Sequence, residues 1–225
     1  RTGVGGRIAL AAANTLTSTL TVAAPSGAVS VGSIDGAFPV VIDAMGGDVT
    51  ATGPIGAAVE LDSLTVMSSP ATFSVVGATS AIDLMAVTAG VLFDASGVER
   101  LTLRGGTIQA EDGGRITLGP TVRLTGDTTL AATTGEVRSG AIDGPFSLLI
   151  EALGGSVMLD APIGHDDALS SISVTAATAD LADVAAERSI DFGGVDHLTM
   201  RGGTIAGADG ATIQFSPNVA LLDAV

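Results

Sequence analysis

The sequence predicts an all-β fold, a β-solenoid in which short strands stack coil upon coil. Runs such as RITL, DSLTV and TIQF alternate apolar with polar residues, which is the period-two pattern of half-buried strands. Only 3% of the residues are aromatic, so Val, Ile, Leu and Ala have to form the core. A long segment also recurs within the chain, which is typical of folds built from stacked repeats.

The repeat keeps a fixed spacing over its first half and loses it over the second. Ile34 begins an Ile-Asp-Gly motif that recurs at Ile142, 108 residues later. The motif LTLRGGTI begins at Leu101 and recurs as LTMRGGTI at Leu198, only 97 residues later. The second unit has therefore lost 11 residues before this motif.

We therefore predict one continuous solenoid over residues 1–225 rather than separate domains. Its repeat units are 5–112 and 113–209, and a third unit starts at 210–225. Independent domains are separated by linkers, and no segment of this chain has the composition of a linker.

The predicted strands are short, and turn residues separate them. The clearest lie at 62–66, 100–106, 115–118 and 212–215, with Thr or Ser at the outward positions. Gly, Asp, Pro and Asn punctuate the chain between them, as turns require. Segments 78–87 and 176–186 are rich in Ala, and for both the sequence leaves a short helix or a pair of strands open.

Two all-β architectures suit a unit of about 100 residues: a tandem pair of β-sandwiches, or a solenoid with several coils in each repeat. Sandwich cores depend on large aromatic residues, whereas narrow stacked coils bury small aliphatic ones. The composition therefore favours the solenoid, with about 20 residues in each coil.

The net charge of −15 and the absence of Lys exclude some classes of partner. A protein that neutralises nucleic-acid phosphates needs clustered basic residues, so we expect no DNA or RNA partner. No stretch of 18 apolar residues occurs, so we expect no membrane insertion. No cap is evident at either end, so we expect further copies of the repeat, or of the chain, to cover the end coils.

The repeated segment resembles repeats of large bacterial surface proteins of the filamentous-haemagglutinin-like and autotransporter-passenger type. The second copy departs from their pattern at Ala161. The matching positions are Asp35, Gly36, Val40, Ile42, Ala44, Gly47, Val49, Gly53, Ile55, Gly56, Leu61, Ser63, Leu64 and Val66.

The resemblance implies a right-handed parallel β-helix that is exported to the cell surface or the extracellular space. It implies a non-catalytic adhesin, stalk or filament, with host or neighbouring-cell glycans or proteins as partners. The absence of Cys fits export of an unfolded chain. One alternative is a subunit that polymerises end to end into an extracellular filament or sheath.

No residue combination predicts a catalytic, cofactor or metal site. Calcium is the one ion that acidic turn residues would suit, although we expect these residues to be solvated. His165 and His197 are both expected to be exposed. The Arg-Gly-Gly motifs at Arg104 and Arg201 are expected to form turns, with each Arg paired to a carboxylate. The acidic turn residues are Asp35, Asp43, Asp48, Asp143, Asp160, Asp166 and Asp167.

The remaining alternative is a polysaccharide-active β-helix enzyme. Such enzymes use carboxylates on adjacent coils as acid and base. Asp83, Asp94 and Glu99 lie in the part of the first unit that is shortened in the second unit. Tyr and Trp, which stack on sugar rings, are absent from the chain, so we predict that the protein is not an enzyme.

Overall fold

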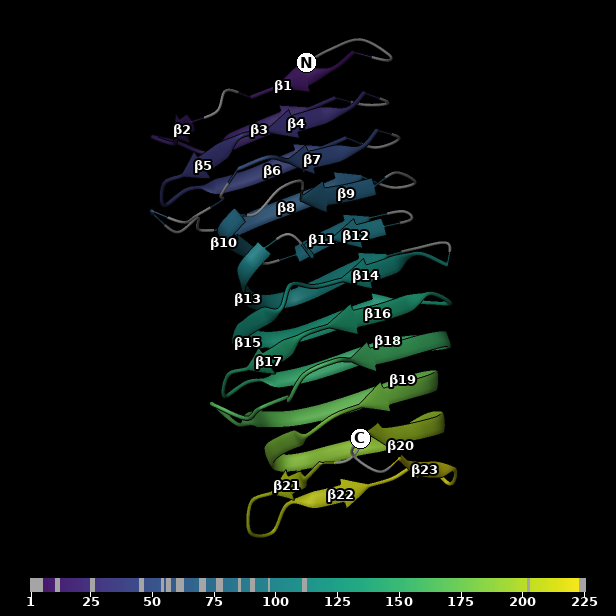
Figure 1. Ribbon diagram of the computed structural model, residues 1–225. Coiled ribbons are helices and arrows are strands. Elements are labelled where there is room, and N and C mark those ends of the chain that lie inside the picture. The colour runs from purple at the N-terminus through teal and green to yellow at the C-terminus, as the bar shows by residue number, and fades with distance from the viewer. Residues whose placement is uncertain are drawn as a thin grey trace.

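A computed structural model gives the arrangement of the chain (Figure 1). Every element of the described residues is a strand, and all pairings between these strands are parallel. The described residues are 6–10, 13–24, 27–44, 47–53, 55, 58–59, 63–68, 72–75, 79–84, 86–89, 92–96, 98–110, 113–201 and 203–222.

The chain winds through three faces in turn, and each face stacks on the same face of the next coil. The stack runs from β1 at the top of Figure 1 to β22 and β23 at the bottom. Pairing offsets range from 17 residues, as in Leu169 to Ala186, to 24 residues, as in Pro39 to Ser63. The β-solenoid prediction is confirmed. Tandem sandwiches are excluded, because sandwich strands pair in antiparallel fashion.

Face 1 is a ladder that is continuous from the first strand to the last. Its members are β1 (Ile8–Ala9), β4 (Val29–Val31), β7 (Val49–Ala51), β9 (Thr72–Val75), β12 (Leu92–Asp94), β14 (Arg115–Thr117), β16 (Glu136–Ser139), the ends of β18 (Ser147–Leu159), β19 (Leu169–Leu181) and β20 (Val184–Arg201), and β23 (Val219–Leu222).

Face 2 follows face 1 along the chain and contains the shortest pairings, some of them single bridges. Its members are β2 (Ala13–Thr15), β5 (Ser33–Asp35), Ile55, β10 (Thr79–Leu84), the starts of β13 (Val98–Ala110) and β15 (Thr121–Ala132), β17 (Ala141–Asp143), Ile163, the start of β20, and β21 (Ile205–Gly207).

Face 3 closes each coil before the chain returns to face 1. Its members are β3 (Leu20–Ala23), β6 (Pro39–Asp43), β8 (Ser63–Ser68), β11 (Ala86–Ala89), the ends of β13 and β15, the starts of β18 and β19, the middle of β20, and β22 (Thr212–Gln214).

Both Ala-rich segments, for which the sequence allowed either a short helix or strands, form strands. The first holds β10 and β11, and the second holds the end of β19 and the start of β20. Stacking decides this outcome, because a strand in these positions gains hydrogen-bonded neighbours from the adjoining coils, whereas a short helix would leave those neighbours unpaired.

The interior is a slim column of aliphatic side chains. Alternate residues point inward, so equivalent positions of successive coils stack directly on one another. Val49 and Ile55, two of the positions that carry the resemblance, are both buried. On face 2 one such column runs Leu101, Val122, Ile142, Ile163 and Val184. Phe93 and Phe192 are the largest fully buried side chains of the described residues.

The two halves of the repeat behave differently in the coil. A step of 108 residues spans five coils, from Ile8 to Ile116 on face 1, so the first half returns to the same face. A step of 97 residues is not a whole number of coils. Leu101 therefore lies on face 2, where it pairs with Val122, whereas its counterpart Leu198 lies on face 1.

The corner between faces 3 and 1 is so tight that backbone stacks directly on backbone. A Cβ atom on Gly155 would overlap the carbonyl oxygen of Gly135, and one on Gly135 would overlap that of Gly114. The neighbouring Gly154 is different, because a Cβ atom there would meet only the Thr134 side chain, at 3.5 Å. Glycine is therefore required at one of these two adjacent positions and not at the other.

This contrast predicts that Gly155→Ala destabilises the fold and that Gly154→Ala does not. The new methyl group in Gly155→Ala forces successive coils apart, at a cost of about 1–3 kcal/mol in the free energy of unfolding. Gly154→Ala should stay within about 0.5 kcal/mol of the parent protein. Urea unfolding followed by circular dichroism measures both, and equal midpoints for the two variants would contradict the backbone stacking at this corner.

Candidate functional site

The interior of the described coils contains few polar side chains. Its buried polar side chains are Thr128, Ser139 and Ser216, and the Ser139 hydroxyl has no hydrogen-bond partner there. An unpaired buried hydroxyl costs stability and faces no solvent. Groups that interact with other molecules therefore have to lie on the outward side of the three faces.

The repeated Ile-Asp-Gly motif holds a loop of the following coil. The Asp143 Oδ1 atom accepts hydrogen bonds from the backbone N–H groups of Asp166 and Asp167, at 3.0 and 3.4 Å. In return, the Gly144 N–H group donates to the Asp167 carbonyl oxygen at 3.0 Å. Gly144 adopts a φ of 131°, which a residue with a side chain rarely adopts.

The first unit repeats this arrangement. The Asp35 Oδ1 atom accepts from the N–H groups of Ala58 and Val59, at 2.8 and 3.3 Å, and Gly36 has a φ of 129°. The same bonds at the same spacing show that the motif is structural. In both copies the aspartate and the glycine fix the loop by which the longer coil leaves face 2.

Several of the acidic turn residues that would suit calcium are already engaged in contacts within the fold. Asp35 and Asp143 use a carboxylate oxygen to hold backbone N–H groups, and Asp160 and Asp167 pair with arginines. In the described part of the chain, no three His, Cys, Asp or Glu side chains gather in a way that could hold a metal ion. Calcium binding stays a prediction without a site.

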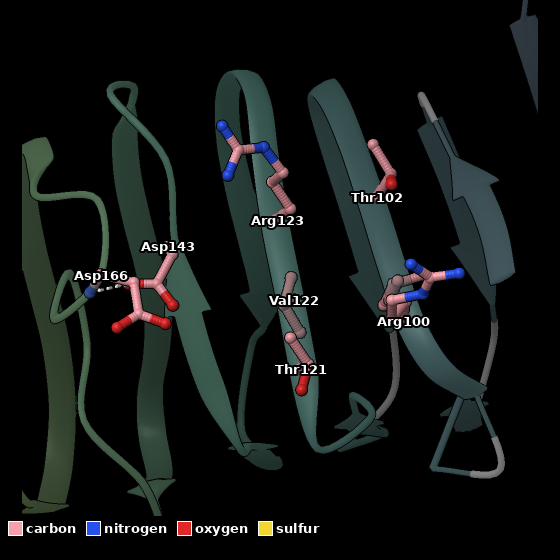
Figure 2. Close-up of a pocket in the computed structure, with 8 residues that line it drawn as sticks. Arg100, Thr102, Thr121, Val122, Arg123, Asp143 and Asp166 are labelled. Atoms are coloured by element: carbon pink, nitrogen blue, oxygen red, sulfur yellow. Dashed lines mark hydrogen bonds between the residues drawn. The ribbon is translucent and has the colours of Figure 1, made fainter. Parts of the chain in front are cut away.

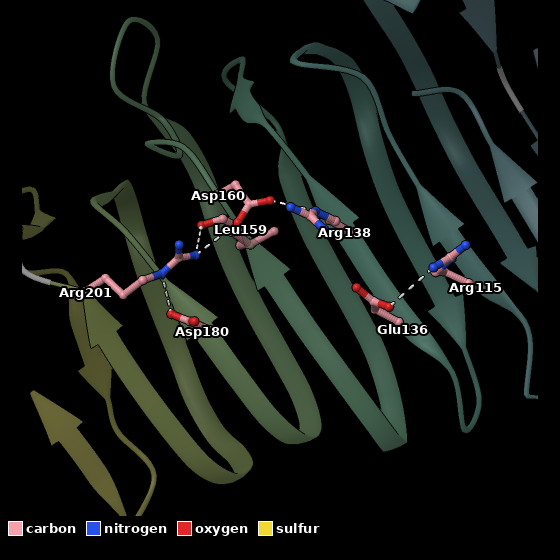
Figure 3. A network of polar contacts seen from close by, with 7 residues as sticks. All are labelled: Arg115, Glu136, Arg138, Leu159, Asp160, Asp180 and Arg201. Atoms are coloured by element: carbon pink, nitrogen blue, oxygen red, sulfur yellow. Dashed lines mark hydrogen bonds and ion pairs between the residues drawn. The ribbon is translucent and has the colours of Figure 1, made fainter. Parts of the chain in front are cut away.

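A network of ion pairs runs across the coils on face 1 (Figure 3). Arg201 bridges two carboxylates of successive coils, with its Nε atom 2.6 Å from Asp180 and its Nη2 atom 3.3 Å from Asp160. Asp160 also binds Arg138 at 2.7 Å. Burial of the guanidinium lowers the pKa of Arg201, but the hydrogen bonds and charges of Asp180 and Asp160 outweigh this effect and raise it.

The second Arg-Gly-Gly motif therefore meets its prediction, because Arg201 pairs with carboxylates and Gly203 turns the chain with a φ of 111°. The first motif also forms a turn, since Gly105 and Gly106 have φ values of 99° and 88°. The two turns lie at different corners, because the second copy of the motif begins on another face.

The structure describes the side chains of both histidines and of Asp94, one of the three acidic residues of the enzyme alternative. His165 and His197 are both exposed, as predicted. Asp94 accepts a hydrogen bond from the Ser96 N–H group at 3.0 Å, which is a local turn contact. The side chains of Asp83 and Glu99 lie outside the described residues.

The outward side of face 2 carries a hollow of about 320 Å³ over β13, β15 and β17 (Figure 2). Its polar lining consists of Arg100, Thr102, Thr121, Arg123, Asp143 and Asp166. Arg123 also forms an ion pair with Asp167 at 3.1 Å. Sequence reasoning missed this group. The sequence contained a signal for it. In RLTLR and in TVRL polar residues alternate with apolar ones, and the two segments are 21 residues apart. A coil of about this length places their polar side chains side by side.

Comparison of the chain with protein-family models, with curated proteins and with solved structures gives no significant match. The described part of the chain also contains no helix of the length and hydropathy needed to cross a membrane. Function therefore has to be inferred from the fold and from its surface.

The paired loop contacts predict the effect of removing one carboxylate. Asp143→Ala deprives two backbone N–H groups of their acceptor and should lower the free energy of unfolding by about 1–2 kcal/mol. Amide hydrogen exchange measured by NMR should speed up at Asp166 and Asp167. Asp143→Asn is the matched control, because its side-chain oxygen still accepts and should restore most of the protection. Unchanged exchange in Asp143→Ala would show that the carboxylate does not hold the loop.

Proposed function

We propose that this chain is a length of an elongated β-solenoid rod with a structural or adhesive role on a bacterial cell surface. Its task is to span distance and to present a repetitive lateral surface, without catalysing a reaction. Partners bind to its sides, and further coils of the same kind cover its ends.

The observation that carries this proposal is the uninterrupted stacking of faces 1 and 3 through the described chain. Each coil uses its backbone groups to bind both the coil before and the coil after it. Such a fold grows only along its axis, by adding coils, so its length increases while its width stays constant. That geometry suits a stalk or fibre better than an enclosed active site.

The proposed location on a bacterial cell surface rests on the resemblance of the repeat to repeats of bacterial surface proteins. The positions that carry the resemblance include Asp35 and Gly36, which hold the loop, and Ile55 in the core, so the pattern marks residues that this coil needs. The lack of cysteine agrees with passage of an unfolded chain through an export pore.

Immunogold labelling of the source cells tests the proposed location. Antibodies raised against the purified chain should label intact, unpermeabilised cells along projections or a surface layer. An antibody against a cytoplasmic protein serves as the control for intact membranes. Labelling that appears only after permeabilisation would contradict a role on the cell surface.

A second candidate function, end-to-end assembly, is favoured by the last described coil. Ile213, Val219 and Leu221 pair with buried residues of the preceding coil, and the Phe215 ring lies 6.4 Å from that of buried Phe192, yet these four side chains are 40 to 80% exposed. Among the described strands, β22 and β23 each pair on one side only, with β20. We propose that the first coil of a second copy, with β1 and β3, stacks there, because it presents the matching parallel edges and its own inward Ile8 and Leu20.

Electron microscopy of the purified chain at increasing concentration tests this assembly. Short rods should join into linear stacks, and Leu221→Asp should abolish them by placing a charge in the junction. Leu153→Asp is the matched control, because Leu153 is 62% exposed on the side of the rod and not at its end. Single rods at every concentration, or equal loss of stacks in both variants, would contradict end-to-end stacking.

A further inference from the structure

The hollow on face 2 is lined by charged and hydroxyl side chains, of which Asp143 and Arg123 also hold a loop of the fold. Two outward columns cross it. In one, Thr102 pairs with Arg123 and Arg123 with Asp143; in the other, Thr121 pairs with Ala141. Neighbouring strands are about 4.8 Å apart and alternate residues along a strand about 7 Å. The polar groups therefore form a grid, and the short Ala141 side chain leaves open space within it.

One side of the hollow is a wall with a fixed position. Asp166 lies on the loop that Asp143 holds through two backbone N–H groups (Figure 2). Arg123, which lies two coils before this loop, fastens it through an ion pair with Asp167. A ligand would therefore meet a preformed surface and would not have to order a loop on binding.

Arg100 lines the hollow on the side away from this wall, and its guanidinium group points toward the preceding coil (Figure 2). Among the residues that the structure describes, the side chains of Arg100, Thr102 and Thr121 make no hydrogen bond or ion pair, whereas Arg115, Arg123, Arg138 and Arg201 all have carboxylate partners. These three side chains and the Asp166 carboxylate line the hollow, and none of them has a hydrogen-bond or ion-pair partner among the described side chains.

The first repeat unit supplies an internal comparison. It holds the equivalent loop with Asp35 in the same way, and its β2 and β5 pair in the same register as β15 and β17. The positions equivalent to Thr121, Arg123, Asp166 and Asp167 are Ala13, Thr15, Ala58 and Val59. The fold therefore forms this loop and this face without any of the four polar side chains of the second unit.

We propose that the hollow binds a carboxylated sugar residue. Arg100 takes the carboxylate, because the planar guanidinium fork matches two carboxylate oxygens. Thr102, Thr121 and Asp166 take ring hydroxyl groups, since hydroxyl side chains both donate and accept and a carboxylate accepts. The volume of about 320 Å³ lies at the lower end of the range for small-molecule sites, and the hollow opens along the face, so a saccharide chain continues past it. This site goes beyond the rod proposal and does not depend on where the protein is located.

A pair of ligands that differ only in the carboxylate tests the site. The ¹⁵N-labelled protein is titrated with methyl glucuronide and with methyl glucoside, and chemical shifts are followed by NMR. We expect saturable shifts on β13, β15 and the loop after Ile163 with the glucuronide, and affinity at least about tenfold weaker for the neutral glucoside.

Three variants locate the interaction. Arg100→Ala should lose at least about tenfold in glucuronide affinity, and Arg100→Lys should recover only part of it, because lysine keeps the charge but not the fork. Arg188→Ala is the matched control, since it removes the same charge from an exposed position on a later coil and should bind as the parent protein does. The thermal midpoint of each variant is measured first to establish that it folds.

The proposal is overturned if the parent protein shows no saturable binding, if it binds both sugars equally, or if Arg100→Ala and Arg188→Ala bind the glucuronide alike. Shifts that map to another face would overturn it as well. None of these results would affect the rod proposal, which is tested by labelling of intact cells.

Discussion

Backbone hydrogen bonds between successive coils are the interaction on which the rest of the structure depends. Ile8 donates to Ala28 at 3.0 Å near the first strand, and Leu198 donates to Asn218 at 2.9 Å near the last. A coil of about 20 residues has too little interior to bury its own backbone. Its polar groups are satisfied only by the coils on either side, so the fold is stable as a stack and not as a single coil.

Stacking at this distance restricts the side chains more strongly at the corners than on the faces. At the corner between faces 3 and 1, Gly155 lies directly on Gly135, and no other residue fits there. At the exit from face 2, Asp143 and Gly144 fix a longer loop. The faces tolerate many outward side chains, so their surface can vary without cost to the core.

The fold class could be predicted from sequence because alternation and repetition are local signals. The burial of Val49 and Ile55 in the structure agrees with the same alternation. The change of face of Leu198 relative to Leu101 could not be predicted, since it depends on the sum of all coil lengths between them. The hollow was missed for the same reason. Thr102 and Arg123 become neighbours only when the coil length is known to the residue, and no local motif marks that length.

Distances between spin labels on one outward column test the stacking most directly. Ser30, Thr117 and Thr199 lie on the same outward column of face 1. Thr117 is four strand-to-strand steps from Ser30, and Thr199 is eight such steps from Ser30. The chain has no cysteine, so cysteine pairs at these positions take unique labels. Pulsed electron paramagnetic resonance should give narrow distributions near about 19 and about 38 Å, from a rung spacing of about 4.8 Å. Broad distributions, or a ratio far from two, would contradict the stack.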